Sequence, residues 1–290
     1  MVDLESLRCF VAVVETQHFA AAARRVALSP AAFSERVRRL EESLDARLLE
    51  RTSRRVRVTE AGLRLLPHAR RMLEDAARCG LVARGSEAPL PFELTIGTRY
   101  ELGLSWLAPA LGALEAARPE RTIHLAMADT DDLLHGLDRR RLDAVVFSAP
   151  DLRPHLRSAP LHEERYVFVA APGLPWDPGR VGEARLIDVS PDLPLFRYLA
   201  DTGVADGWRF GRCQYMGGIG GIRSRALEGA GVAVLPRYFV QPDLDAGRLV
   251  DLLPGRELAT DWFRLVWRAD HPREEELVGL AAELRGRELR

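Results

Sequence analysis

The spacing of apolar residues at the start of the chain predicts three consecutive helices. Residues 4–16 place leucine, phenylalanine and valine at helical spacing, and Asp3 precedes them as a capping residue. Residues 19–26 predict a second, short helix, and its run of alanines allows another helix to approach closely. Ser29 and Pro30 follow as a capping hydroxyl and a first helical residue, so a third helix is expected to begin here.

The third helix has one apolar face, which determines what its opposite face exposes. The apolar face carries Phe33, Val37, Leu40 and Leu44. The outward face carries Ala31, Ser34, Glu35 and Arg38, with Arg36 and Arg39 on its flanks. Two short helices joined by a tight turn, the second of them basic and exposed, are typical of a helix-turn-helix motif.

A basic hairpin and a long helix are expected next. Residues 47–62 interleave arginines with threonine, serine and valine, and the alternation at 56–58 favours a small β-wing. From Thr59 to about Arg84 the pattern predicts one helix with an apolar stripe, in which Pro67 causes a bend or marks the first turns. Because the stripe needs a cover, we expect a second copy of the chain to pack against it.

After a linker at residues 85–91, strand and helix patterns alternate along the chain. Strand-like runs at 92–97, 122–128 and 143–148 are separated by helical patterns at 104–117 and from Thr130 to Leu142. This βαβαβ order predicts a parallel sheet with right-handed crossovers. A second set of strands and helices follows to about residue 236, and a last strand and helix return to the first set. Two α/β lobes with a cleft between them are therefore expected.

The charge of the chain is divided unevenly between its two parts. Residues 1–85 hold 16 Arg against 11 Asp and Glu, a formal charge of +5, whereas the remaining residues hold 25 against 31, or −6. A basic head on an acidic body suggests a polyanion as the partner of the head. All the basic residues are Arg, which excludes a Schiff base, a phosphate-loop lysine and a kinase lysine.

Other features of the composition exclude several kinds of site. Cys9, Cys79 and Cys213 are far apart in sequence and form no C-x-x-C pair, so we expect reduced thiols, no metal site and no cofactor. No apolar run is long enough to span a bilayer, and Asp3 and Glu5 stand where a secretory signal needs positive charge. We therefore expect a cytoplasmic protein without a membrane partner.

The stretch from Phe19 to Gly62, followed by the long helix, resembles the N-terminal domain of LysR-type transcriptional regulators. The segments "TDDLLHGLDRRRLDAVVF", "GAGVAVLP" and "LDAGRLVDLLP" are similar to the effector domain of that family. The resemblance implies a homodimer or homotetramer of α/β class overall. It also implies a winged helix-turn-helix, a long linker helix, and a two-lobed α/β, periplasmic-binding-protein-like effector domain that senses a small molecule.

The resemblance and the residue patterns together divide the chain into four segments. We expect a winged helix-turn-helix at 1–58, a linker and dimerisation helix at 59–84, a hinge linker at 85–91 and an effector-binding domain at 92–290. Within the last segment, lobe I is expected at about 92–160 and 262–290, and lobe II at about 161–261.

The resemblance assigns DNA contacts to the outward face of the third helix and to the wing. The matching positions are Ser29, Ala31, Ser34, Glu35 and Arg38 in the helix, and Arg51, Arg54 and Arg55 in the wing. Physical reasoning agrees, because a major groove admits a helix and phosphates attract arginine regardless of sequence. Double-stranded DNA is therefore the expected partner.

Two of these assignments have alternatives. Glu35 either accepts a hydrogen bond from cytosine N4 or pairs with Arg39 within the helix, and we favour the pair slightly. Arg54 and Arg55 either contact DNA or lie in a solvated turn, and we favour DNA contact. Pro30 and Glu35 also depart from residues common in the family, so the base preference cannot be copied from its other members.

Candidate effector contacts follow the carboxyl ends of the predicted strands, where ligands bind in open α/β sheets. They are Thr98, Arg99, Tyr100, Thr130 and Ser148 from the first lobe, and Met216, Gly217 and Gly218 from the second. A helix start after Gly218 favours an anion and Arg99 can clamp a carboxylate, so a small anionic or zwitterionic metabolite is predicted. Alternatively, Thr98 only caps a helix, Arg99 is solvated, and the glycines only permit a turn.

Three classes of function remain, and a regulator is the favoured one. It would read an interrupted dyad near promoters, change its arrangement when an effector binds, and have RNA polymerase as a further partner. An enzyme is the main alternative, but the chain has no G-x-S-x-G or H-E-x-x-H motif, and residues 162–164 are interpreted as a solvated strand end. The third class, a non-specific architectural DNA-binding protein, needs no effector cleft.

Overall fold

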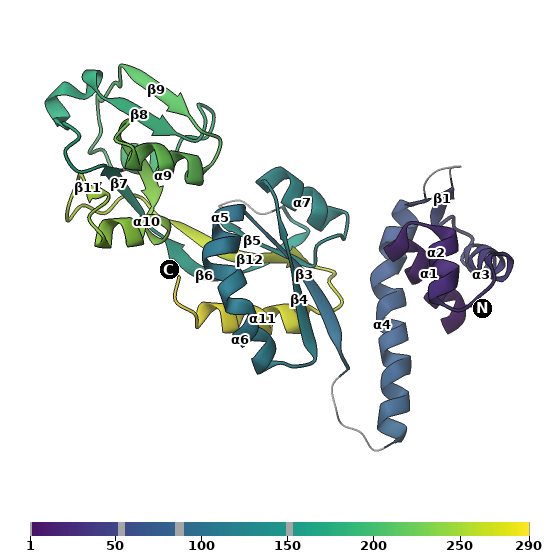
Figure 1. Cartoon of the computed structure of the whole chain (residues 1–290). Coiled ribbons are helices and arrows are strands. Elements are labelled where there is room, and N and C mark those ends of the chain that lie inside the picture. Colours follow the sequence, from purple (N-terminus) through teal and green to yellow (C-terminus); the bar gives the residue numbers. More distant parts are fainter. Residues whose placement is uncertain (1, 52–55, 85–89, 149–152, 290) are drawn as a thin grey trace. The chain divides into compact units, whose positions relative to one another are not determined.

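The computed structural model describes residues 2–51, 56–84, 90–148 and 153–289, and Figure 1 shows the elements that they form. The chain divides into two compact units, one of residues 1–93, 119–122 and 270–274, and the other of residues 94–118, 123–269 and 275–290. Helices dominate the first unit and the second combines helices with sheets, so the expected α/β class is confirmed.

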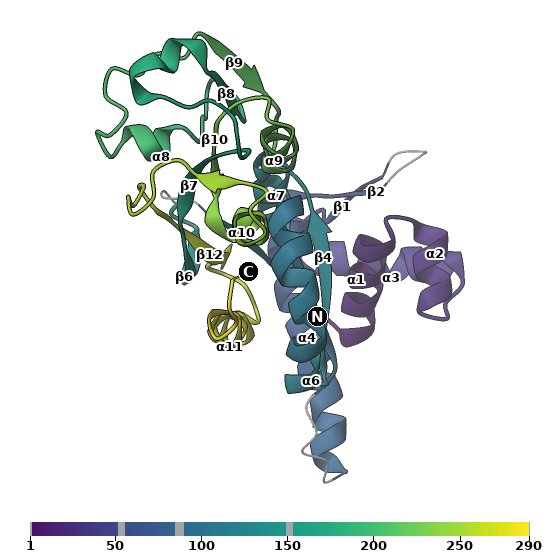
Figure 2. The same ribbon diagram turned by 60° about the vertical axis from the view of Figure 1, so that its left-hand side comes forward.

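The first unit contains the three predicted helices, the hairpin and the long helix. Its elements are α1 (Leu4–Thr16), α2 (Phe19–Arg25), α3 (Pro30–Ser43), β1 (Leu49–Arg51), β2 (Val56–Val58) and α4 (Glu60–Ala83). Strands β1 and β2 pair antiparallel, with Glu50 opposite Arg57. Figure 2 shows this hairpin extending away from α1, α2 and α3.

Side-chain caps fix where these helices begin. The Ser6 N–H donates to Asp3 Oδ1 at 2.9 Å, and the Ala32 N–H donates to Ser29 Oγ at 3.3 Å. The hydroxyl of Thr59 accepts from the Gly62 N–H at 3.0 Å at the start of α4. Each cap satisfies a donor that the first helical turn leaves free, so three predicted helix starts are confirmed.

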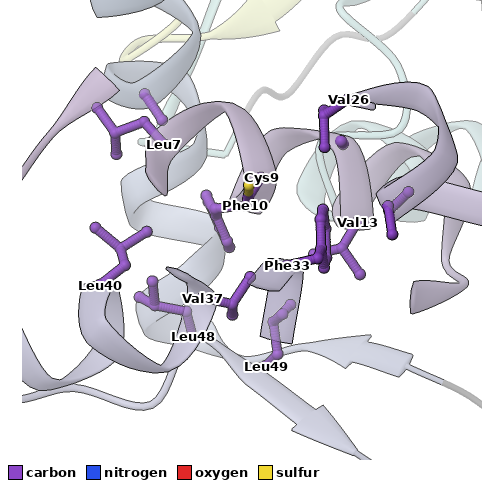
Figure 3. Packing of buried hydrophobic residues seen from close by; sticks show 14 of the residues in the cluster. Leu7, Cys9, Phe10, Val13, Val26, Phe33, Val37, Leu40, Leu48 and Leu49 are labelled. Carbon is purple, nitrogen blue, oxygen red and sulfur yellow. The ribbon is translucent and has the colours of Figure 1, made fainter. Parts of the chain in front are cut away.

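The apolar face of α3 packs into the core of the first unit (Figure 3). Phe33 and Val37 are fully buried there, and the ring of Phe33 meets the edge of Phe19 at a centroid distance of 5.6 Å. Leu40 is also buried, whereas Leu44 is only half-buried because the helix ends before it. The predicted inner face of α3 is therefore confirmed over its length, and the residues between these positions point outward.

The apolar stripe of α4 is buried in its first part and exposed further along. Leu66 and Ala69 are buried in the core of the first unit, so the head itself covers the first part of the stripe. Met72, further along, is 48% exposed and lacks such a cover. The helix runs through Pro67 without interruption, at a position beyond its first turn.

Lobe I of the second unit is built on a five-stranded sheet of order β4-β3-β5-β12-β6. Its strands are β3 (Phe92–Thr98), β4 (Arg121–Met127), β5 (Ala144–Ser148), β6 (Leu156–Glu164) and β12 (Asp261–Arg268). Its helical segments are α5 (Tyr100–Leu102), the π-helical turn η1 (Gly103–Leu107), α6 (Ala108–Ala117), α7 (Thr130–Asp138) and α11 (Glu274–Arg285). Figure 1 shows the yellow β12 and α11 among the teal elements of this lobe, so the predicted return of the chain is confirmed.

The sheet is parallel where β3 and β5 of the predicted βαβαβ unit pair, and it also contains antiparallel pairs for which no direction was predicted. Strands β3 and β5 are parallel, but β12 runs antiparallel to both β5 and β6. The reason is the connection to the other lobe: β6 leads the chain out of lobe I and β12 brings it back, so the two strands run in opposite directions. Helix α7 also ends earlier than the predicted Leu142, because Arg140 adopts a left-handed conformation with φ 56°.

Lobe II combines a three-stranded sheet of order β10-β7-β11 with the parallel pair β8 and β9. Its elements are β7 (Tyr166–Ala170), the 3₁₀ helix η2 (Pro178–Glu183), β8 (Arg185–Asp188), α8 (Arg197–Ala200), β9 (Arg212–Tyr215), α9 (Ile219–Leu227), β10 (Ala233–Pro236), α10 (Arg237–Asp245) and β11 (Val250–Asp251). Strands β10 and β11 are antiparallel to β7, so this lobe is also mixed. No helix within the described residues has the length and apolar character needed to cross a membrane.

Gly62 provides a test of how tightly the hairpin packs on α4. A Cβ atom at Gly62 would lie 2.3 Å from the Leu48 carbonyl oxygen and 2.7 Å from Val58 Cγ1. We expect Gly62→Ala to lower the free energy of unfolding by about 1–3 kcal/mol through overpacking, measured by urea unfolding followed by circular dichroism. Gly80→Ala in the same helix is the control: the nearest atom, at the flexible end of Arg84, lies 3.6 Å away. That change should raise stability by about 0.5–1 kcal/mol, and equal effects of the two variants would contradict the packing argument.

Candidate DNA-binding and effector-binding surfaces

The outward face of α3 brings together four of the eight residues predicted to contact DNA. Ala31, Ser34, Glu35 and Arg38 line one side of a surface hollow of about 700 Å³, which the first turn after the helix completes. Ser29, the cap of the helix, is exposed at its start. The burial of Phe33 and Val37 on the opposite face holds these side chains outward.

Glu35 is the centre of an ion-pair network on this face. Its carboxylate accepts two hydrogen bonds from Arg38, through Nε at 2.8 Å and Nη2 at 2.7 Å, and one from Arg39 Nε at 2.8 Å. Glu42 contacts Arg38 Nη1 from the next turn. The favoured pair between Glu35 and Arg39 is therefore confirmed, and Arg38 is an additional partner that the sequence analysis did not include.

Glu41 of α3 and Thr59, which follows β2, both bind the root of the hairpin, residues 47–49. Glu41 Oε1 accepts from the N–H groups of Leu48 and Leu49, at 2.8 and 3.1 Å. The Thr59 hydroxyl donates to the Arg47 carbonyl at 2.6 Å. These bonds fix the start of the wing relative to α3.

The predicted wing contacts are described only in part. Arg51 is the last residue of β1, and its side chain lies outside what the structure describes. Arg54 and Arg55 also lie outside the described residues. Their contact with DNA remains a prediction.

The predicted effector residues of lobe I have different environments. Thr98 is fully buried and its hydroxyl donates to the Val146 carbonyl at 3.1 Å, so it serves the sheet. Arg99 Nη2 donates to Ser148 Oγ at 3.4 Å, which joins the ends of β3 and β5. Tyr100 is 54% exposed at the start of α5, and Thr130 is half-buried at the start of α7.

At the start of α9 the chain itself provides a carboxylate. Glu101 of lobe I accepts the Gly220 N–H of lobe II at Oε1, at a distance of 3.1 Å. A Cβ atom at Gly218 would lie 3.4 Å from this oxygen, and one at Gly220 would lie 3.2 Å from it. The predicted preference of this helix start for an anion is thus met by a residue absent from the prediction, although Glu101 lies in the same turn as Arg99 and Tyr100.

The remaining lobe II residues shape the backbone before α9. Gly217 has φ +73°, a left-handed conformation that favours glycine, and no atom lies within 4 Å of the position of its missing Cβ. Met216 is half-buried and lies against Gly221. Among the described residues, no hydrogen bond joins Tyr100, Thr130 or Gly217 to another predicted effector residue.

Glu164 is a buried carboxyl group that the sequence analysis interpreted wrongly. It was taken as part of a solvated strand end, but it is only 1% exposed because β6 pairs with β12 along its whole length. The hydroxyls of Tyr166 and Ser148 hydrogen-bond to it, and burial raises its pKa against the opposing effect of Arg99. Its Oε2 atom has no hydrogen-bond partner among the described residues.

The cysteines are free and lie in different environments. Cys9 is buried in the core of the first unit, whereas Cys79 and Cys213 are exposed. Within the described residues, no group of three or more His, Cys, Asp or Glu side chains is placed to hold a metal ion.

The pairing of Glu35 predicts a pH dependence. Hydrogen bonds from Arg38 and Arg39 lower the pKa of Glu35 to about 2. Because the folded-state pKa is lowered, the contribution of these pairs to stability is complete above the ordinary value of 4.5 and is lost as pH falls toward 2. We expect the side-chain carboxyl resonance of Glu35 to titrate near 2 in an NMR pH series. A midpoint close to 4.5 would contradict the network.

Comparisons with known proteins agree with this division of the chain. The family model described as a bacterial regulatory helix-turn-helix protein of the lysR family matches residues 4–63. The model described as the LysR substrate binding domain matches residues 90–287, more than half of the chain. The helix-turn-helix and the two lobes thus correspond to separate family models.

Relatives over the full length carry different names. A probable hydrogen peroxide-inducible genes activator of Streptomyces viridosporus is 30% identical over 302 residues, covering 98% of this chain and 93% of its own. The SDS degradation transcriptional activation protein of a Pseudomonas species is 31% identical over 301 residues, covering 97% of this chain and 95% of its own. Among solved structures, ArgP from Mycobacterium tuberculosis has a TM-score of 0.70 at 20% identity and covers 99% of this chain and 98% of its own. The helix-turn-helix head, the two α/β lobes and the full-length matches lead to one conclusion: the chain belongs to the LysR family and is a DNA-binding transcriptional regulator with an effector-binding domain.

Proposed function

We propose that this chain is a cytoplasmic sensor that regulates transcription from an interrupted dyad near promoters. Two heads contact the two half-sites, and a small anionic or zwitterionic metabolite between the lobes changes which half-sites the heads can span. The segments proposed for these tasks are 1–58 for DNA binding, 59–84 for dimerisation, 85–91 as a hinge linker, and 92–290 for the effector, with lobe II at about 161–261.

The outward face of α3 is the observation that carries the DNA-binding part of the proposal. Ala31, Ser34, Glu35 and Arg38 share one surface, and the rigid core behind Phe33 fixes their positions. A helix presented in this way fits the major groove, where side chains near its start reach base edges. We propose Ser29 for a contact beside this surface, and Arg51, Arg54 and Arg55 for contacts of the wing with phosphates or a narrow minor groove.

Assembly of the heads is proposed to depend on α4. Met72 and Val82 are exposed large apolar side chains of α4 that the head does not cover. A second copy that packs on these side chains buries the stripe, which supports a homodimer or a homotetramer. Contact with RNA polymerase at the promoter belongs to the same proposal.

The start of α9 supports an anionic or zwitterionic effector. Its Gly220 N–H already holds a carboxylate, that of Glu101, and Arg99 lies two residues before Glu101 in the same turn. A carboxylate of the effector would replace Glu101 at this position, while an ammonium group of a zwitterion would pair with Glu101 itself. Ser148, Tyr100, Thr130 and the backbone around Met216, Gly217 and Gly218 are proposed as further contacts, and Thr98 as a support of the sheet beneath them.

A thiol switch is not favoured for this chain. The relative from Streptomyces viridosporus is named for induction by hydrogen peroxide, but residues 92–290 here contain a single cysteine, Cys213. An internal disulfide in the effector-binding segment needs a second cysteine. We therefore expect hydrogen peroxide to leave the DNase footprint of the wild type and of Cys213→Ser unchanged, and a peroxide-dependent footprint that Cys213→Ser abolishes would contradict this expectation.

The DNA-binding proposal is tested by recovering fragments of the host genome on purified protein at near-physiological salt and sequencing them. Discrete sites that share an interrupted dyad are the expected result. Uniform recovery of all sequences, with a steep dependence on salt, would indicate an architectural DNA-binding protein. Chemical change of a bound ligand would instead indicate an enzyme.

The effector proposal is tested by removing the carboxylate of Glu101. Without this competitor, we expect Glu101→Ala to bind the purely anionic probes acetate and succinate several-fold more tightly, measured by isothermal titration calorimetry. Glu228→Ala is the control, because it removes the same charge at the other end of α9, where Glu228 pairs with Arg225. Equal behaviour of the two variants would overturn the proposed position of the effector's anionic group.

A further inference from the structure

The outward face of α3 carries a carboxylate where a simple phosphate-binding helix would carry only neutral or basic groups. The side chain of Glu35 is 39% exposed, and those of its partners Arg38 and Arg39 are 53% and 71% exposed. The network therefore lies on the surface that would meet DNA. A carboxylate at this place repels phosphate, but it can accept a hydrogen bond from a base edge.

The hydrogen bonds within the protein leave Glu35 with capacity for one more donor. A carboxylate has about four acceptor sites on its two oxygens. Three are occupied, two by Arg38 and one by Arg39. In the major groove, the group that donates to a carboxylate is the N4 amino group of cytosine.

Arg38 keeps donors as well. A guanidinium group has about five N–H donors, and those of Arg38 make three hydrogen bonds, two to Glu35 and one to Glu42. The remaining N–H groups suffice for O6 and N7 of a guanine. The pair of Glu35 and Arg38 thus presents an acceptor and donors side by side.

The surroundings of the pair disfavour contact with phosphate. The hollow beside it is lined by four carboxylates, those of Glu35, Glu41, Glu42 and Asp45, and by only two guanidinium groups, those of Arg38 and Arg47. This part of α3 is therefore not a basic patch. Other parts of the head therefore have to supply the binding energy that comes from counterion release. This part of α3 contributes by discriminating between bases.

We propose that Glu35 is a specificity-determining residue. It accepts a hydrogen bond from cytosine N4 in each half-site. On other DNA sequences, its bonds to Arg38 and Arg39 keep these two side chains from binding phosphates. The inference rests on the proposed DNA-binding function. It adds the base that is read and a mechanism of discrimination. Where the base edge offers no donor, the carboxylate is desolvated without compensation and the complex is weakened.

The experiment compares the wild type with Glu35→Gln, Glu35→Asp and Glu42→Gln. Each protein selects from a random-sequence duplex library, and its affinity for the wild-type site and for sheared genomic DNA is measured over a series of salt concentrations. We expect Glu35→Gln to lose about tenfold in preference for cytosine at one position of each half-site, because a neutral amide oxygen accepts more weakly than a carboxylate and the amide also pairs with adenine. It should also bind sheared DNA more tightly, with a log–log salt slope steeper by about one for each phosphate gained.

The other variants separate charge from base reading. Glu35→Asp keeps the charge but shortens the side chain, so the salt slope should stay at the wild-type value while the cytosine preference falls. Glu42→Gln removes the same charge from the same partner, Arg38, one turn away, and should keep the cytosine preference. Thermal unfolding of each variant verifies that α3 remains folded.

An unchanged cytosine preference in Glu35→Gln overturns the proposal, whether or not the salt slope changes. An equal loss of preference in Glu42→Gln also overturns it, because the effect would then come from charge alone. If the wild type itself enriches no discrete site, the proposed DNA-binding function fails instead. The two failures are therefore distinguishable.

Discussion

Burial of Phe33 and Val37 is the constraint on which reading of DNA by this chain depends. Both side chains are fully inside the core of the head, so α3 cannot rotate about its axis without exposing them. The rotation of the helix decides which residues face outward, and the outward residues decide what can be recognised. Caps at Ser29 and Thr59 add a fixed start to α3 and α4. The position of Glu35 and Arg38 on the surface thus follows from apolar packing on the other side of the helix.

The elements of the head could be predicted because they depend on local patterns. Helix α3 combines a capping hydroxyl, a proline at its first position and an apolar repeat, and all three agree. The sheet of lobe I was predicted less well, since the direction of β12 depends on a return from the other lobe and leaves no local pattern. Helix α7 ends before Leu142 because Arg140 adopts a left-handed backbone conformation. The polar residues around Arg140 do not predict this conformation.

The contacts within the candidate sites also divide into those that local spacing predicts and those that only the fold creates. The pair of Glu35 and Arg39 spans one helical turn and could be predicted from spacing alone. Glu101 and Gly220 are 119 residues apart, and only the fold brings them together. Glu164 was misinterpreted because its neighbours His162 and Glu163 suggested a solvated strand end, whereas pairing with β12 buries it.

The bonds of Glu41 and Thr59 to the root of the hairpin have a consequence for the architecture of an operator. They hold α3 and the root of the hairpin together, so in the proposed complex the spacing between a groove contact and a backbone contact at this root is set by the protein. An inserted base pair inside a half-site shifts one contact by about 3.4 Å and rotates it about the duplex axis, and the bonds at the root of the hairpin oppose a matching shift of the protein. In the proposed complex, variation in operator length is therefore expected only in the segment between half-sites, where it changes the distance between heads and leaves each head's own contacts intact.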